Sequence, residues 1–196
     1  MTVEFDEVVA VAGLRYAADW LDASDQVQLL AAIDVTPWSS ELRRRVQHFG
    51  HRYDYGRRSV GAHDPAPPLP GWSRMLVDRL GWDVPPDQVI VNEYLPGQGI
   101  SPHVDCVPCF GPIVATLSLG SACTMDFLDP DSGVRVPVRL GKGSLCEMTR
   151  AARYQWRHTI PARKSDPSSA GRVPRGRRVS VTFRTVLTKI GPSSQS

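Results

Sequence analysis

The sequence predicts a mainly β fold of the α+β class, a sandwich or barrel with a helical N-terminal part. From Gln88 onward, short β-branched or alternating segments are separated by Gly, Pro or Asp, whereas the first third places apolar residues at helical spacing. The strands do not alternate with helices, so a doubly wound parallel sheet is disfavoured. A chain of 196 residues suits one domain with a sizeable core.

Two helices are expected in the first third. One begins at Asp22 or Ser24, either of which can cap a helix. Its apolar residues fall on one face, and they are Val27, Leu29, Leu30 and Ile33. A second helix is expected around residues 72–80, and the Gly- and Pro-rich segment 61–71 before it is expected to be a loop.

Seven segments from Gln88 onward are expected to be strands. They are QVIVNEYL, IVATLSLG, CTMDFLD, VRVPVRL, SLCEMT, RYQWRHTI and RRVSVTFRTVL. Residues 163–176 are polar and rich in breakers, which predicts a flexible basic loop. Residues 191–196 are expected to form a disordered tail.

Charge is distributed unevenly, although the net charge is only +3. Residues 1–134 hold 9 basic and 18 acidic side chains, whereas residues 135–196 hold 14 basic and 2 acidic ones. The basic part predicts either an anionic partner such as nucleic acid or a solvated basic face. Charge alone does not separate these alternatives.

Composition also bears on location and redox state. No segment approaches 18 consecutive apolar residues, and no basic segment precedes an apolar run at the N-terminus, so we expect neither a membrane span nor a secretory signal. Four cysteines in a chain of this length do not predict a disulfide framework, so we expect a cytoplasmic protein. A single C-x-x-C pair, Cys106 and Cys109, argues against a zinc ribbon, and these residues are expected to be packing residues or oxidisable thiols.

Two histidines and one carboxylate could form a metal site. His103 and Asp105 are two residues apart and share a face of an extended segment, and His158 lies in another expected strand. This is the ligand set of the facial triad, which leaves positions on Fe(II) open for a chelating cosubstrate and O2. The alternative is three ordinary hydrogen-bonded side chains, since the chain has five histidines.

The last expected strand has strict alternation. Arg178, Ser180, Thr182 and Arg184 share one face, and apolar side chains share the other. If the arginines face outward they are solvated. If they face inward they need anions, because breaking a buried pair costs about 3–5 kcal/mol. A dicarboxylate such as 2-oxoglutarate would provide one carboxylate for each arginine.

Several motifs occur in a fixed order along nearly the whole chain, from about Gly13 to Val186. They are Asn92-x-Tyr94-x-Pro96-Gly97, His103-x-Asp105, Ser118-Leu119-Gly120, Met125-Asp126-Phe127, Arg153-Tyr154, His158 and Arg178-x5-Arg184. Together they resemble the AlkB family of Fe(II)/2-oxoglutarate-dependent dioxygenases. The amino-acid sequence of these motifs is most similar to that of the oxygenase domain of the homologue that hydroxylates the tRNA wobble uridine.

The resemblance implies a double-stranded β-helix, or jelly roll, with a helical N-terminal extension. One domain would cover residues 1–190, with 1–87 as the helical, substrate-covering part and 88–190 as the jelly-roll core. The resemblance also implies an enzyme that hydroxylates a C–H bond while 2-oxoglutarate and O2 yield succinate and CO2. The sequence does not determine the oligomeric state, and a monomer is expected. An N-methyl base would then release formaldehyde, whereas a side chain attached through carbon would keep the hydroxyl.

The resemblance assigns roles to individual residues. The Fe(II) ligands would be His103, Asp105 and His158. The side chains that bind 2-oxoglutarate would be Asn92, Tyr94, Arg178, Ser180 and Arg184. Within this set, Arg178 and Tyr94 would hold the distal carboxylate, and Arg184 and Asn92 would lie near the carboxylate beside the keto group. Ser180 stands where repair-type members have Asn.

Substrate choice is expected to lie in residues 48–58, where aromatic and basic residues alternate. The substrate-binding candidates are Tyr53, Tyr55, Arg57 and, from the basic part, Arg153. Aromatic rings can stack on an extruded base while arginines bind phosphate, which suits RNA, tRNA or single-stranded DNA. A hairpin edge with core aromatics is an equally weighted alternative. Val107 replaces an acidic residue of repair-type members, which argues against methyladenine or methylcytosine as the substrate.

Other function classes remain open. One is a 2-oxoglutarate-dependent hydroxylase of a protein or small molecule, and another is a nucleic-acid-binding module with an inactive metal site. A zinc deaminase is disfavoured, because the glutamate of its H-x-E signature is missing.

Overall fold

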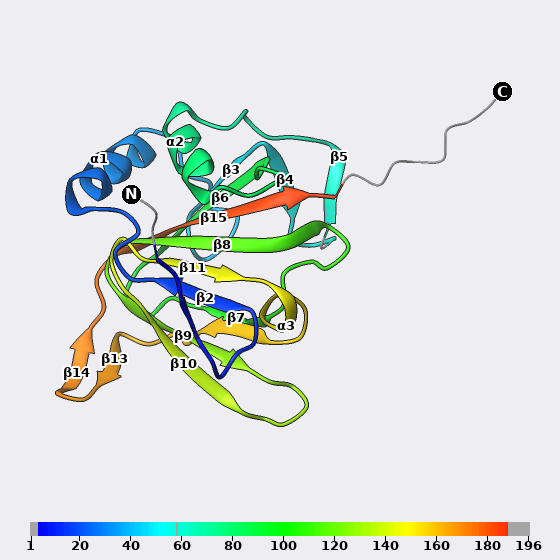
Figure 1. The fold of residues 1–196 in the computed structure, drawn as a ribbon. Coiled ribbons are helices and arrows are strands. Elements are labelled where there is room, and N and C mark those ends of the chain that lie inside the picture. The colour runs from blue at the N-terminus through cyan, green and yellow to red at the C-terminus, as the bar shows by residue number, and fades with distance from the viewer. Residues whose placement is uncertain (1–3, 58, 188–196) are drawn as a thin grey trace.

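Two antiparallel β-sheets face each other in the computed structural model, which describes residues 4–57 and 59–187 (Figure 1). From edge to edge, the larger sheet contains β1 (Asp6–Glu7), β2 (Leu14–Ala17), β11 (Leu145–Met148), β8 (Phe110–Gly120), β15 (Arg178–Val186), β6 (Gln88–Tyr94) and β3 (Val46–Phe49). The smaller sheet contains β10 (Arg135–Leu140), β9 (Cys123–Leu128), β12 (Arg157–Ile160) and β7 (Ile100–His103). The predicted jelly roll is confirmed.

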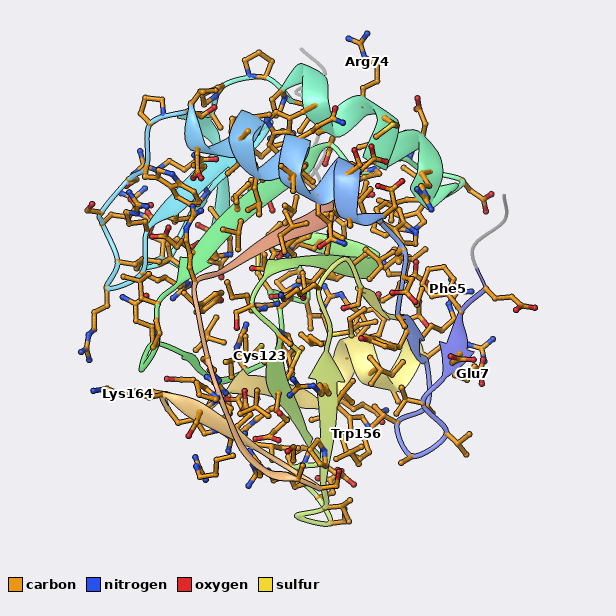
Figure 2. The ribbon with its side chains drawn as sticks, turned by 90° about the vertical axis from the view of Figure 1, so that its left-hand side faces the viewer. Phe5, Glu7, Arg74, Cys123, Trp156 and Lys164 are labelled. Carbon is orange, nitrogen blue, oxygen red and sulfur yellow. A yellow bond between two sulfur atoms is a disulfide. The ribbon has the colours of Figure 1, made fainter. Side chains whose placement is uncertain are left out.

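Two helices cover the outer face of the larger sheet, α1 (Ala23–Asp34) and α2 (Gly71–Leu80) (Figures 1 and 2). The predicted cap is confirmed at Asp22, whose carboxylate accepts a hydrogen bond of 2.8 Å from the backbone N–H of Asp25. On α1, only Leu29 and Ile33 of the four predicted apolar residues are buried, and Val27 is 68% exposed. No helix in the described part of the chain is long and apolar enough to cross a membrane.

The two faces of β15 have different partners, as its alternation predicts. Val179, Val181 and Phe183 belong to the apolar cluster that packs against the helices, together with Ile33 and Leu76. This packing fixes the strand on its outer side. The arginines of the same strand therefore project to the opposite face, into the space between the sheets.

The N-terminal third is less helical than expected. It supplies β1, β2 and β3 to the larger sheet, and it also forms a hairpin of β4 (His51–Asp54) and β5 (Ser59–Pro65). The prediction of a loop over residues 61–71 is therefore wrong for its first five positions. The segment RYQWRHTI also differs from its predicted strand, because its first two residues belong to α3 (Arg150–Tyr154) and the strand begins only at Arg157. The predicted tail at residues 191–196 lies outside the described residues.

The segment 163–176 contains a hairpin of β13 (Ser165–Ser168) and β14 (Gly171–Pro174), where a flexible loop was predicted. The buried carboxylate of Asp166 anchors this hairpin. It accepts hydrogen bonds of 2.7 and 2.8 Å from Arg175 and one of 2.8 Å from Arg163. It also accepts a hydrogen bond of 3.2 Å from the backbone N–H of Thr124 in β9. The sequence could not show this anchor, because Asp166 lies among breakers and polar residues that locally favour a loop. Figure 2 shows Lys164 beside the hairpin, pointing away from the sheets.

The anchor predicts acid sensitivity. Burial raises the pKa of Asp166, but hydrogen bonds and charges from Arg175 and Arg163 outweigh it and bring the pKa to about 2. The unfolded pKa is about 3.9, so the carboxylate contributes on the order of 2–3 kcal/mol above pH 4, and this contribution is lost as the pH falls through about 2. We expect Asp166→Asn to lower the free energy of unfolding at pH 7 by about this amount, with the difference from wild type shrinking from pH 4 downward. Urea unfolding from pH 7 to pH 3 measures it, and a constant difference over this range contradicts it.

Candidate metal centre

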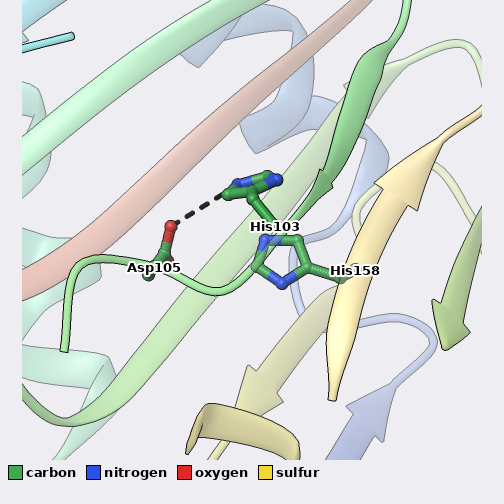
Figure 3. A group of neighbouring side chains, drawn as sticks. All are labelled: His103, Asp105 and His158. Carbon is green, nitrogen blue, oxygen red and sulfur yellow. Dashed lines mark ion pairs between the residues drawn. The ribbon is translucent and has the colours of Figure 1, made fainter. Parts of the chain in front are cut away.

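Three segments bring His103, Asp105 and His158 together (Figure 3). His103 ends β7, Asp105 lies in the loop between β7 and β8, and His158 lies in β12. Because β12 pairs with β7, His158 is directly opposite His103, and the two ring centroids are 4.2 Å apart. One ligand atom from each residue lies within 4.8 Å of the other two. The expected triad is therefore assembled, although Asp105 lies beyond the strand rather than within it.

The protonation states suit metal binding. His103 Nδ1 lies 2.8 Å from the carbonyl oxygen of Ser101, so this nitrogen donates the hydrogen bond and Nε2 is the atom of the ring that a metal would contact. Burial, followed by the neighbouring His103, lowers the pKa of His158 to about 3, so this imidazole is neutral at neutral pH. Burial raises the pKa of Asp105, but Arg184 and the two histidines hold it well below its usual range. Two neutral imidazoles and one carboxylate are the donor set that Fe(II) takes in facial triads.

Arg184 pairs directly with the metal-binding carboxylate. Its Nη2 and Nε donate to Asp105 Oδ1 and Oδ2 at 3.2 and 3.3 Å. Its Nη1 donates to Gln88 Oε1 at 3.3 Å, and its guanidinium lies 4.8 Å from the centroid of the Phe110 ring. Arg184 thus faces the space between the sheets, which shows that the face of β15 that carries the arginines is the inward one.

Arg178 is a buried cation with unused hydrogen-bonding capacity. Its residue is 3% exposed, and its Nη2 donates to Ser118 Oγ at 2.9 Å. Within the described residues, its Nε and Nη1 have no hydrogen-bond partner. Its guanidinium lies 5.4 Å from the centroid of Tyr94, the residue opposite it on β6. Buried charged donors without partners are costly, so this position fits the carboxylate of a bound anion such as 2-oxoglutarate.

A cavity of about 580 Å³ opens onto the metal ligands. The residues that line it include the metal-binding pair His103 and Asp105, with Asn92, Arg184, Tyr53, Tyr55, Phe110, Arg43 and Arg44. Ser180 is buried opposite Asn92 on the adjacent strand. The structure therefore brings together the metal triad, part of the expected cosubstrate set and both candidate tyrosines.

Arg44 is a further residue of the cavity that was not predicted from the sequence. Its Nε donates to Asn92 Oδ1 at 2.9 Å, and its guanidinium lies 5.8 Å from the centroids of both Tyr55 and Tyr94. The only available signal was the run of three arginines at 43–45. The run does not show that the middle residue faces the cavity while Arg45 pairs with Glu93 on the other face of the sheet.

Arg153 and Arg57 are not placed as predicted. Arg153 is 1% exposed, and its guanidinium donates only to backbone carbonyls, so it cannot contact a phosphate in this structure. The side chain of Arg57 is 81% exposed, pairs with Asp54 at 3.6 Å and does not line the cavity. Sequence spacing cannot distinguish a buried arginine from a solvated one.

Cys106 and Cys109 are joined in a disulfide, which is the oxidised form of the oxidisable thiols that were one of the two expectations for this pair. A turn brings them together, with the N–H of Cys109 donating to the carbonyl of Cys106 at 3.2 Å. Cys123 and Cys146 are free and buried, and burial raises the pKa of Cys146 to about 12. The C-x-x-C spacing allows either state, and only the folded turn decides which is formed.

Internal pairing uses much of the basic surplus that suggested nucleic acid. Arg163 and Arg175 pair with Asp166, and Arg177 pairs with Asp34 and Glu93. Among the described cations from residue 135 onward, those that are exposed and have no carboxylate partner are Arg139, Lys142, Arg150, Arg157, Lys164 and Arg172. The net charge of the C-terminal part therefore overstates what a phosphate backbone could contact.

A protein-family profile described as "2OG-Fe(II) oxygenase superfamily" matches residues 39–184, the part that holds the triad and the cavity. The chain belongs to this superfamily. It is an Fe(II)/2-oxoglutarate-dependent dioxygenase, with His103, Asp105 and His158 as its metal-binding triad.

Similar curated proteins support the AlkB family within this superfamily. A Macaca fascicularis tRNA (carboxymethyluridine(34)-5-O)-methyltransferase, ALKBH8, is 35% identical over 89% of this chain and 30% of its own length. An Arabidopsis thaliana protein named alkylated DNA repair protein ALKBH8 homolog is 30% identical over 92% of this chain and 60% of its own length. An uncharacterised protein of Acanthamoeba polyphaga mimivirus is 32% identical, with coverage of 89% and 85%. The chain thus spans under a third of the macaque relative.

Solved structures share the fold at low identity. OsALKBH1 superposes with a TM-score of 0.70 at 18% identity, covering 93% of this chain and all of that chain. A 2OG-Fe(II) oxygenase from Burkholderia pseudomallei gives a TM-score of 0.60 at 14% identity, with coverage of 88% and 84%.

The centre predicts a spectroscopic signature. When Fe(II) and 2-oxoglutarate are added together without oxygen, we expect a visible charge-transfer band, because the cosubstrate chelates the metal that the triad holds. Asp105→Ala should lose the band, since it removes the anionic ligand. The control is His51→Ala, whose imidazole lies 3.6 Å from Asp87 outside the triad and whose loss should leave the band. Absence of the band from the wild-type protein contradicts the assignment.

Proposed function

We propose that this dioxygenase oxidises a modified base in nucleic acid, either RNA, tRNA or alkylated single-stranded DNA, by demethylation or hydroxylation. The observation that carries the proposal is the cavity, which combines metal ligands with the rings of Tyr53, Tyr55 and Phe110. The names of similar proteins support it, because they describe a tRNA methyltransferase, an alkylated DNA repair protein and a probable RNA/DNA demethylase from Danio rerio.

The aromatic rings form a continuous wall of the cavity. The centroids of Tyr53 and Tyr55 are 5.2 Å apart, and those of Tyr53 and Phe110 are 5.7 Å apart. An extruded base presents a flat π-face that such rings can stack on, and the basic residues Arg43 and Arg44 lie in the same cavity. This combination suits an unpaired nucleotide better than an aliphatic substrate.

The cosubstrate site is proposed for the inner face of β15 and β6. Arg178 and Tyr94 would take the distal carboxylate of 2-oxoglutarate, because two buried nitrogens of Arg178, Nε and Nη1, have no hydrogen-bond partner among the described residues. Arg184 and Asn92 would lie near the other carboxylate, since both line the cavity beside the metal ligands. Ser180, opposite Asn92, would line the space between these two ends.

The oxidation that the bound groups would supply is distinct from the roles of the chain's own residues. Bound Fe(II) with 2-oxoglutarate and O2 supplies the oxidation, in which one oxygen atom enters succinate, the other enters the substrate C–H bond, and CO2 leaves. His103 and His158 supply neutral nitrogen donors, and Asp105 supplies the negative charge. Arg184 holds the Asp105 carboxylate in its ionised form by direct pairing. The aromatic wall orients the base above these ligands.

The cosubstrate assignment predicts a large effect of Arg178→Met. The variant removes charged hydrogen-bond donors worth about 2–3 kcal/mol, so the KM for 2-oxoglutarate should rise roughly 30- to 150-fold. Succinate release at varied 2-oxoglutarate measures it. Arg139→Met, at an exposed position of β10, is the matched control and should leave this KM unchanged. A KM within twofold of wild type for the Arg178 variant contradicts the assignment.

The substrate proposal predicts that nucleic acid stimulates succinate release. Total tRNA and methylated single-stranded oligonucleotides are compared with no substrate. Tyr53→Leu should raise the KM of the stimulating nucleic acid about 5- to 150-fold, since stacking contributes about 1–3 kcal/mol per base, whereas Tyr53→Phe should retain stimulation. If no nucleic acid stimulates the wild-type enzyme, the proposal is wrong.

The second candidate is a hydroxylase of a protein or small molecule. It is favoured by the charge pairing on the segment that carries Tyr53 and Tyr55, where Arg52 pairs with Glu41 at 2.7 Å and Arg57 pairs with Asp54 at 3.6 Å. Salt separates the two candidates, because binding to a single strand weakens with a log–log slope of about −0.7 per phosphate contact. A flat salt response favours the second candidate.

A further inference from the structure

We infer that Arg153 is a positioning residue of the metal centre, which holds the loop carrying Asp105 against the segment carrying His158. The inference concerns metal binding and does not depend on the identity of the substrate. It assigns a role to a buried cation that neither the triad nor the cavity includes.

The contacts of Arg153 converge on the ends of one short loop. Nη1 donates to the carbonyl of Asp105 at 2.9 Å, and Nη2 donates to that of Cys106 at 3.3 Å. Nη2 also donates to the carbonyl of Phe110 at 3.1 Å, and Nε donates to that of Gly111 at 3.1 Å. Residues 105 and 106 begin the loop, and residues 110 and 111 open β8. One planar guanidinium therefore fixes both ends of the loop at once.

Burying the charged guanidinium of Arg153 costs free energy, and a requirement for a specific loop geometry would account for that cost. Arg153 is 1% exposed, and burial lowers the pKa of its guanidinium. Among the residues that the structure describes, no carboxylate lies within 4.0 Å of it, so the charge is stabilised by backbone carbonyls and by the Tyr154 ring, whose centroid is 4.9 Å from the guanidinium. Apolar residues of similar size often stabilise a fold as well as buried charges do. The distinctive property of the arginine is its planar set of donors, which carbonyls can hold in one orientation.

The backbone of Arg153 lies in the segment that leads to the metal ligand His158. Arg153 belongs to α3, and His158 lies five residues after it in β12. The helix is fixed to the N-terminal part, because the N–H of Ala152 donates to the carbonyl of Ala12 at 2.9 Å and that of Thr149 to Gly13 at 2.8 Å. Arg153 thus connects a fixed helix that leads into one ligand with the loop that carries another.

Other constraints on the loop do not make this connection. The disulfide between Cys106 and Cys109 ties the loop only to itself. Arg184 contacts the carboxylate of Asp105 from β15, whereas Arg153 contacts its backbone carbonyl. The backbone and the side chain of the metal ligand are therefore held by different arginines from different elements.

The test measures Co(II) binding to the full chain by visible absorption, without 2-oxoglutarate or oxygen. Arg153→Met and Arg153→Lys are compared with wild type well below their thermal midpoints. The ammonium of Lys has three donors on one atom and cannot reach both loop ends, so both variants should bind Co(II) about 10- to 100-fold more weakly, as expected when a partner of a metal ligand is lost. Arg150→Met, an exposed arginine of the same helix, is the matched control and should retain wild-type affinity.

A second readout separates positioning from general stability. At saturating Fe(II), the KM for 2-oxoglutarate should stay within twofold of wild type, because the proposed cosubstrate residues lie on β6 and β15. If a folded Arg153 variant melts at a lower temperature but binds Co(II) within twofold of wild type, Arg153 supports the fold alone and the inference is overturned. Arg153→Lys keeps the charge and most of the length, so it serves as the test where Arg153→Met does not fold.

Discussion

The pairing of β12 with β7 is the interaction on which the metal centre depends. It sets His158 opposite His103 and leaves Asp105 to complete the site from the following loop. The hydroxyl of Thr159 reinforces the pairing by donating to the carbonyl of Ile100 at 2.6 Å. The strands approach so closely that a Cβ at Gly99 would lie 2.1 Å from the carbonyl oxygen of Ile160, so this position requires glycine. The geometry of two metal ligands is thus a property of the sheet.

The interior between the sheets carries more positive than negative charge at the site. Arg184 pairs with the ionised carboxylate of Asp105, whereas Arg178 donates to the hydroxyl of Ser118 and Arg44 to the amide oxygen of Asn92. Arg178 keeps buried N–H groups without partners in the described chain. Such an excess is unfavourable in the protein alone, and it becomes favourable when an anionic cosubstrate enters.

Much of this site could be predicted from the sequence because β15 has a strict period of two. Val179, Val181 and Phe183 had to share one face, so Arg178 and Arg184 had to share the other, and the helices covering the apolar face decide which one is inward. The ligand types of the triad were also visible in the sequence. Arg44 was not, because a run of three arginines has no period that shows which member faces a cavity. The hairpin at 165–174 was missed for a similar reason, since its anchor Asp166 is stabilised by distant partners.

The sequence by itself determined the fold class, the strand that carries the two inward arginines and the donor types available for a metal. Only the tertiary structure decided which charged side chains are exposed to solvent and which pair with each other. Arg177 reaches Glu93 across 84 residues, and Arg184 reaches Asp105 across 79. Arg153, read in sequence as a phosphate contact, is instead buried against the loop of a metal ligand. The physical reason is that local periodicity fixes the face of an element on which a side chain lies, whereas its partner comes from a segment that only folding brings near.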